Sequence, residues 1–184
     1  MTECLTGIDI GKLICLKRLL FEVKINKSLS HPIIMPDIVK KKVGVGFGVM
    51  ILRDNHVLLG RRHVDPNKAD SELHGEGTWT MPGGKLEFQE SFEDGAKREL
   101  FEETGMIGHS FRIISLTNDI VHDAHFVTIG LVCEHFEGEP KVMEPDEITE
   151  WKWFQLNNLP KPLYFPSEEI LKNYSEKKFY QKFH

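Results

Sequence analysis

Acidic side chains on the apolar stripe of one predicted helix constrain this 184-residue sequence more than any other feature does. On a helix over residues 91–104, drawn at about 100° per residue, Phe92, Ala96, Glu99 and Glu103 fall within about 60° of one another. Glu99 and Glu103 are therefore a like-charge pair on the face that should meet the core, which is unfavourable unless a cation compensates it. The pattern predicts a positively charged group among these carboxylates.

The residue types around this stripe narrow the choice of cation. Arg98 can reach Glu102 four residues later, but one guanidinium cannot neutralise three carboxylates. The face offers oxygen donors and neither cysteine nor histidine, so Mg²⁺ is favoured over Zn²⁺, with Mn²⁺ as a second candidate. Mg²⁺ commonly completes its coordination with phosphate oxygens, which indicates phosphoryl or diphosphate chemistry. The alternative, an ordinary solvated acidic face, does not explain why the glutamates point inward.

The helix lies inside a longer motif. Residues 84–106 read GKLEFQESFEDGAKRELFEETGM. This string resembles the signature of the Nudix hydrolase family: every fixed position matches, and Met106 stands where the family more often has a branched aliphatic residue. The wider resemblance runs from about Val43 to about Tyr174. It implies a Nudix-type α/β/α sandwich with a mixed sheet, an α/β (α+β) fold.

The resemblance also implies roles for single residues. It assigns metal binding to the Gly84 carbonyl and to the side chains of Glu99, Glu102 and Glu103. Arg98 would hold Glu99 in place, Glu90 would support it as an outer carboxylate, and Glu99 would also help to activate water. Many family members have a further acidic residue after the last strands; Glu144 is the candidate here and Glu147 the alternative, although a loop glutamate can equally be solvated. The predicted catalytic residues are Arg98, Glu99, Glu103 and Glu144.

The rest of the sequence predicts strands and a further helix. The predicted strands are residues 43–52, 56–62, 111–116, 125–133 and 150–154, with short extended pieces at 79–81 and 85–88 and a helix over 166–174. Glycines within the first two strands predict that a backbone or a ligand comes close there. The polar residues 63–77 predict a long loop, which is often a lid. This order indicates a mixed α/β layer fold.

The chain is predicted to have two parts that differ in charge. Residues 1–42 hold 8 Lys or Arg against 4 Asp or Glu, a net charge of +4, and the remaining residues hold 15 against 24, a net charge of −9. We expect an N-terminal extension, residues 1–42, with an amphipathic helix and a Pro-containing linker, followed by a Nudix hydrolase domain, residues 43–184. A domain with this net negative charge does not attract nucleic acid. An anionic substrate would need a bound cation between it and the protein.

The sequence also predicts the compartment. The apolar stretch over residues 13–23 is interrupted by Lys17, Arg18 and Glu22, so neither a membrane span nor a secretory signal is expected. Three scattered cysteines argue against a disulfide framework and for a reducing environment. We therefore predict a cytoplasmic protein without a membrane partner.

Sequence around the motif resembles the MutT-like branch, which hydrolyses nucleoside triphosphates. The ADP-ribose branch usually carries a proline shortly after the signature and the dinucleoside polyphosphate branch a tyrosine, and residues 107–139 contain neither. The expected reaction is attack of water on a metal-bound phosphorus, giving a monophosphate and pyrophosphate. An ADP-ribose, nucleotide-sugar or isoprenoid diphosphate substrate is the alternative. A non-catalytic nucleotide-sensing domain is a third hypothesis, against which the complete acidic cluster argues.

Recognition of a base needs a flat apolar surface and a few directed polar groups. The candidates are Phe47, Trp79, Met81, Asn118 and Phe136, although ordinary core packing is an alternative for each aromatic residue. Phe101 lies opposite the acidic stripe on the helix. We expect it to pack under the N-terminal segment or against a second subunit of a homodimer.

Overall fold

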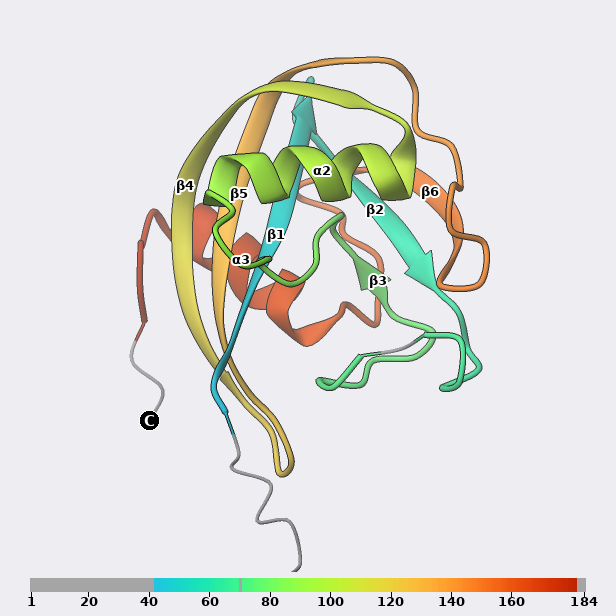
Figure 1. Ribbon diagram of the computed structural model, residues 1–184. Helices are drawn as coiled ribbons and strands as arrows, with labels where there is room; N and C mark the ends of the chain where they lie inside the picture. Colours follow the sequence, from blue (N-terminus) through green and yellow to red (C-terminus); the bar gives the residue numbers. More distant parts are fainter. Residues whose placement is uncertain (1–41, 70, 182–184) are drawn as a thin grey trace, which may run out of the picture. The chain divides into compact units, whose positions relative to one another are not determined.

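The computed structural model describes residues 42–69 and 71–181, and Figure 1 traces their elements. The predicted N-terminal extension lies outside these residues and stays a prediction. The described elements are β1 (Gly44–Arg53), β2 (His56–Arg62), β3 (Trp79–Thr80), α2 (Phe92–Thr104), β4 (Ile107–Ile120), β5 (His125–Glu137), β6 (Ile148–Gln155) and α3 (Phe165–Glu176). Neither of these helices is long and apolar enough to cross a membrane.

The described strands form one mixed sheet of six strands. Its main path runs β3–β2–β1–β5–β4, and β6 pairs with β2. β1 and β5 are parallel along most of β1, whereas the other pairings are antiparallel. The β1–β2 hairpin is paired only beside its turn, at Leu52–Val57 and Arg53–His56. Beyond these two residue pairs, β2 is paired with β6 and β3 instead of β1. One edge of β1 is therefore available for hydrogen bonds to another segment.

The segment 82–86 occupies this edge of β1. Phe47 N–H donates to the Gly84 carbonyl at 2.9 Å, and Val49 N–H donates to the Pro82 carbonyl at 2.7 Å. The extended segment predicted over residues 85–88 is shorter in the structure. Only Lys85 forms a β-bridge, with Gly46 of β1, and the chain then enters a turn. The start of the sequence motif is thus bonded to the central sheet.

Gly83 has no room for a side chain in this segment. Its φ is +154°, and a Cβ atom would lie 2.2 Å from the Phe47 carbonyl oxygen. We expect Gly83→Ala to lower the free energy of unfolding by about 3 kcal/mol, measured by urea denaturation. Gly77→Ala is the matched control, because Gly77 also has a positive φ, +65°, but its nearest neighbour is 3.3 Å away. Equal losses in both variants would contradict the steric explanation.

Two hydrophobic cores lie on opposite faces of the sheet. Alternate residues of β1 point to opposite sides, so Val49 and Ile51 belong to the core with α2 and Met50 to the core with α3. Leu100 joins the first core from α2, and Ile170 joins the second from α3. Figure 1 shows the two helices in front of and behind the sheet. The predicted α/β/α sandwich with a mixed sheet is confirmed.

The ends of α2 follow from its sequence. Ser91 Oγ accepts a hydrogen bond from Asp94 N–H at 3.1 Å and donates to the Asp94 carboxylate at 2.6 Å, which satisfies the first turn. Gly105 ends the helix in the left-handed conformation, with φ +70°. These two caps agree with the helix predicted over residues 91–104.

Candidate active site

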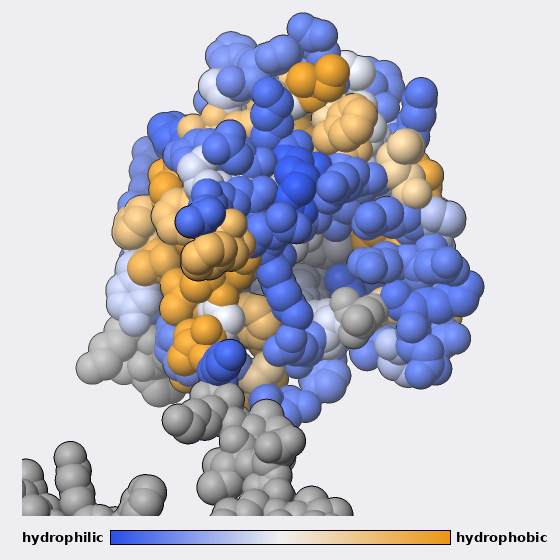
Figure 2. Space-filling model, in the orientation of Figure 1, coloured by the Kyte–Doolittle hydropathy of each residue, from blue (hydrophilic) through white to orange (hydrophobic). Residues whose placement is uncertain are grey.

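A cavity of about 500 Å³ opens beside β1 and the segment bonded to its edge. Its walls come from β1, the segment 82–87, α2, β5 and the start of α3. Figure 2 shows that this face of the molecule is hollowed and bordered largely by hydrophilic side chains. The volume is within the range of pockets that bind nucleotides and other small molecules.

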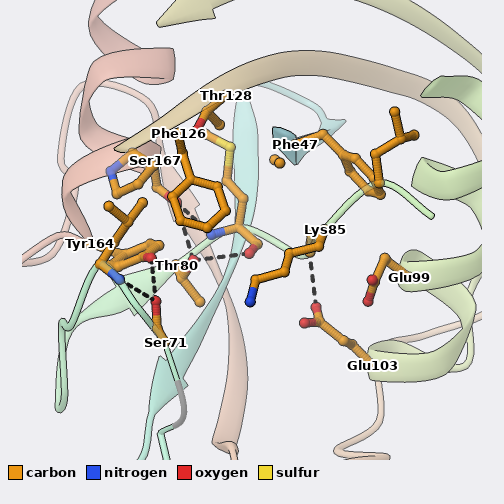
Figure 3. A pocket seen from close by; sticks show the side chains of 18 of the residues that line it. Phe47, Ser71, Thr80, Lys85, Glu99, Glu103, Phe126, Thr128, Tyr164 and Ser167 are labelled. Carbon is orange, nitrogen blue, oxygen red and sulfur yellow. Dashed lines mark hydrogen bonds between the residues drawn. The ribbon is translucent and has the colours of Figure 1, made fainter. Parts of the chain in front are cut away.

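One end of the cavity is acidic. Glu99 and Glu103 point into it from α2 (Figure 3), and Glu144 and Glu147 approach from the segment before β6. The predicted inward position of the two helix glutamates is therefore present in the structure. Both downstream candidates line the cavity; Glu144 raises the pKa of both helix glutamates, and Glu147 raises that of Glu103.

Arg98 organises the carboxylates around it. Its guanidinium donates to both oxygens of Glu90, at 2.9 and 3.1 Å, and to Glu99 Oε1 at 2.9 Å and Glu102 Oε2 at 3.0 Å. The side chains of Arg98, Glu90 and Glu99 are at most 24% exposed, so solvent screens these ion pairs little. The hydrogen bonds to Glu90 are the main cause that raises the pKa of Arg98, followed by those to Glu99 and Glu102, which outweigh its burial.

Glu103 has the most unfavourable surroundings for a negative charge. The residue is 8% exposed, and its carboxylate accepts one hydrogen bond, from Gly83 N–H at 3.3 Å. Burial raises its pKa well above the usual value, and the charges of Glu99 and Glu144 raise it further. Burial and its acidic neighbours likewise raise the pKa of Glu99, although Arg98 opposes the shift. A cation close to these groups would remove the penalty.

The donor set fits a hard divalent ion, but the side chains are not gathered into a finished site. No group of three His, Cys, Asp or Glu side chains within residues 42–69 and 71–181 is arranged to hold a metal. Arg98 instead holds Glu99 and Glu102 by hydrogen bonds. The available ligands are oxygens, including the Gly84 carbonyl, which accepts one hydrogen bond and has a second lone pair. Glu102 is half exposed and does not line the cavity.

The structure places two of the predicted substrate residues at the cavity, Phe47 and Met81, and three elsewhere. Trp79 is buried edge-on against Phe154, with ring centroids 4.8 Å apart.

The other two residues outside the cavity have partners of their own. His125 Nε2 donates a hydrogen bond to Asn118 Oδ1 at 2.7 Å, on the face of β4 and β5 opposite to the one that carries Thr128. Phe136 stacks on Trp153 at 5.9 Å, far along β5 from the residues that line the cavity. Neither residue lines the cavity, so the structure does not bring them to the predicted contact with a base.

Several lining residues were missed by the sequence reasoning. The missed residues include Arg62, Thr80, Lys85, Phe126, Thr128, Tyr164 and Ser167. Phe126 and Thr128 could have been found from the alternation of β5, since they share a face with the glycines of β1. Tyr164 and Ser167 come from the start of α3, and nothing local in the sequence indicates that this turn returns to the cavity.

The polar loop over residues 63–77 contributes one wall, in line with its predicted place beside the site. Ser71, Glu72 and Leu73 line the cavity. Ser71 Oγ is hydrogen-bonded to the Tyr164 hydroxyl at 2.7 Å, and Glu72 forms an ion pair with Lys85 at 2.5 Å. Motion of this loop as a lid stays a prediction.

Phe101 projects from α2 on the side away from the cavity. It is 54% exposed, so the described residues leave about half of it uncovered. Its predicted burial under the N-terminal segment concerns residues outside the described range, and contact with a second subunit stays a prediction.

Known proteins share this fold and motif. Residues 42–174 match the family model described as the NUDIX domain. An ADP-ribose pyrophosphatase from Methanocaldococcus jannaschii is 34% identical over 127 residues, which cover 68% of this chain and 69% of that protein. The oxidized purine nucleoside triphosphate hydrolase of Mus musculus is 33% identical over 120 residues, which cover 61% of this chain and 66% of that protein. A crystal structure of a MutT NUDIX hydrolase from Burkholderia pseudomallei superposes with a TM-score of 0.64 at 31% identity, covering 72% of this chain and 98% of that chain.

Proposed function

This chain belongs to the Nudix hydrolase family, whose members act on diphosphate linkages, and from that premise we propose that its substrate is a nucleoside triphosphate. The products are a nucleoside monophosphate and pyrophosphate. The observation that supports metal-dependent hydrolysis of a diphosphate linkage is the buried Glu103 carboxylate, which lies with Glu99 and Glu144 in a cavity large enough for a nucleotide. Such a group of carboxylates is stable in its charged form when a divalent cation and its phosphate ligands are present.

The residues that would hold Mg²⁺ are Glu99, Glu102, Glu103 and the Gly84 carbonyl, with Glu144 completing the site. The bound ion would supply charge neutralisation at the phosphate oxygens and orient the substrate. A turn of the Glu102 side chain toward the cavity is required for this assignment, because Arg98 holds it at the rim.

The attacking water needs a proton acceptor beside the phosphorus. Arg98 binds Glu99 Oε1 at 2.9 Å and leaves Oε2 without that partner. Glu99 Oε2 is therefore the atom that we assign to accept the proton of water. Glu90 fixes the other side of the guanidinium with two hydrogen bonds, so that the position of Glu99 depends on Glu90 through Arg98.

The choice of a triphosphate rests on similarity and on the sequence after the motif. Two of the similar proteins, from Mus musculus and Burkholderia pseudomallei, are named as a nucleoside triphosphate hydrolase and a MutT protein. Residues 107–139 lack the proline and the tyrosine of two other branches. An ADP-ribose substrate is the second candidate, because an ADP-ribose pyrophosphatase is 34% identical.

A nucleotide panel separates these candidates. We expect pyrophosphate and a monophosphate from at least one nucleoside triphosphate in the presence of Mg²⁺, and turnover of ADP-ribose at least about tenfold lower in kcat/KM. A chelator should reduce the rate more than about a hundredfold, and added Mg²⁺ or Mn²⁺ should restore it. Product identity is read by anion-exchange chromatography. Cleavage that continues with chelator present, or a preference for ADP-ribose, would contradict the respective part of the proposal.

A further inference from the structure

Three buried hydroxyl groups lie at the end of the cavity away from the glutamates. They belong to Thr80, Thr128 and Ser167, whose exposures are 7%, 6% and 3%, and all three line the cavity. Figure 3 shows them on the side of Phe126 and Tyr164, across the cavity from the acidic residues of α2. A hydroxyl has one hydrogen to donate and two lone pairs to accept with, so the direction of each hydrogen determines what the group offers to a ligand.

The hydrogens of Thr80 and Ser167 are used inside the protein. Thr80 Oγ1 donates to the Met81 carbonyl at 3.0 Å, and Met81 N–H donates to Ser167 Oγ at 3.1 Å. The two hydroxyls are 3.2 Å apart. Because the hydrogen of Thr80 is already committed, Ser167 is the donor of this third bond. Each oxygen keeps acceptor capacity, and neither has a hydrogen left for a ligand.

The hydrogen of the Thr128 hydroxyl also has an acceptor inside the protein, the buried carboxylate of Asp119. Asp119 is fully buried on β4, and Thr117 Oγ1 lies 3.2 Å from its Oδ2. Burial raises the pKa of Asp119, while hydrogen bonds from Thr128 and from Thr117 lower it. The other oxygen, Oδ1, has no hydrogen-bond partner. Asp119 thus has more capacity to accept than its neighbours fill, which makes Thr128 the donor in the bond between the two side chains.

We propose that the hydroxyls of Thr80, Thr128 and Ser167 form an acceptor surface that selects a base carrying an amino group, and that Asp119 is a positioning residue that turns Thr128 into an acceptor. This inference rests on the proposed function, in which the substrate is a nucleoside triphosphate. The triphosphate lies at the acidic end and the base reaches the hydroxyl end. A base that places a carbonyl oxygen against this surface meets lone pairs only, which is unfavourable in a buried site.

Donor groups are present in other parts of the cavity lining, and they do not replace this surface. Arg62 lines the cavity, its guanidinium lies 4.9 Å from the centre of the Tyr164 ring, and its buried Nε has no hydrogen-bond partner. Lys85 is paired with Glu72. A carbonyl of the base can bind Arg62, but this contact does not satisfy the three hydroxyl oxygens. The amino group is therefore the feature of the base on which we expect selection to depend.

Pairs of nucleotides that differ by one amino group test the proposal directly. The full-length protein with Mg²⁺ is titrated by calorimetry with guanosine and inosine 5′-monophosphates, and with adenosine and purine riboside 5′-monophosphates. We expect the amino-bearing member of at least one pair to bind about tenfold more tightly. Differences below about twofold in both pairs would overturn the inference and leave nucleoside triphosphate hydrolysis standing. If the triphosphates are not hydrolysed and no monophosphate binds, the proposed function fails as well.

Thr128→Val and Thr117→Val are matched variants that separate recognition from structural support. Both threonines are 6% exposed and hydrogen-bond to Asp119, but only Thr128 lines the cavity. We expect Thr128→Val to reduce the preference for the amino-bearing nucleotide from about tenfold to about twofold, and Thr117→Val to preserve it. Equal effects of the two variants on this ratio would show a merely structural role and overturn the inference.

Asp119→Asn tests the positioning step. An asparagine amide can donate to Thr128 Oγ1, which frees the threonine hydrogen to point into the cavity. We expect the preference for the amino group to fall to about twofold or less while the thermal unfolding transition is retained. An unchanged preference would contradict the role of Asp119. Should this variant fail to fold, the two threonine variants decide the matter.

Discussion

Replacing Glu103 with glutamine should lower turnover at least about a hundredfold and leave the protein folded. Glutamine keeps the shape of the side chain and an oxygen that can accept the hydrogen bond from Gly83 N–H. It removes one negative charge from the most deeply buried carboxylate of the cavity. Without this charge the divalent ion that would neutralise the phosphate oxygens is held less well, and impaired charge stabilisation typically lowers turnover about a hundredfold or more. The measurement is pyrophosphate release at saturating nucleotide and Mg²⁺.

The control for this variant is Glu93→Gln, on the exposed side of the same helix, which should leave turnover unchanged. The stability of Glu103→Gln is informative too. Because burial raises the pKa of Glu103 in the folded state, ionisation opposes folding, and stability is lost as the pH rises through the folded pKa. A neutral glutamine should therefore be at least as stable without metal at pH 7. Near-normal turnover in Glu103→Gln would remove this residue from the catalytic centre.

Replacing Arg98 with methionine should lower both stability and turnover. Methionine retains much of the aliphatic length but leaves Glu90 and Glu99, whose side chains are 13% and 17% exposed, without their cationic partner. Removing one partner of a buried ion pair leaves an uncompensated charge, so we expect a loss of about 3 kcal/mol in the free energy of unfolding. Turnover should fall about tenfold to a hundredfold, because Glu99 is no longer held in position. Urea denaturation and steady-state kinetics measure the two effects.

Lys97→Met provides the comparison for this variant. Lys97 precedes Arg98 on the same helix and is exposed. Its replacement should change the free energy of unfolding by less than about 0.5 kcal/mol and leave turnover unaltered. A small effect of Arg98→Met on stability would mean that the four side chains are sufficiently solvated to be independent of one another.

The local parts of the fold could be predicted from the sequence because their causes are local. Ser91 and Gly105 are caps that act on neighbouring residues, and the predicted and observed ends of α2 agree. Strand β2 also has its predicted bounds. β4 and β5 extend further than predicted, to Ile107–Ile120 and His125–Glu137, because pairing between the two strands continues through polar residues that break the apolar alternation.

The site also has a part that could be predicted from local sequence and a part that could not. The carboxylates of α2 could be placed from a helical wheel, because residues 99 and 103 are fixed on one face by the geometry of a single element. The hydroxyl end of the cavity is assembled from β3, β5 and α3, whose contacts depend on the whole topology. Phe136 was an attractive aromatic candidate in the sequence, but in the structure it stacks on Trp153. Hydrophobicity alone does not distinguish such a pair from a surface that binds a base.

The attachment of residues 82–86 to β1 determines where the length of this chain can change during evolution. The hydrogen bonds from Phe47 and Val49 fix that segment in one register, in which the Gly84 carbonyl points to β1 and its Cα lies against the Glu99 carboxylate. An insertion or deletion of one residue there would reverse the direction of each following peptide group and change which side of residue 84 meets Glu99. The described residues of the polar loop over residues 63–77 have no such backbone hydrogen bonds to β1. Variation in length among related sequences should therefore concentrate in that loop, and with it the variation in the breadth of ligands that they accept.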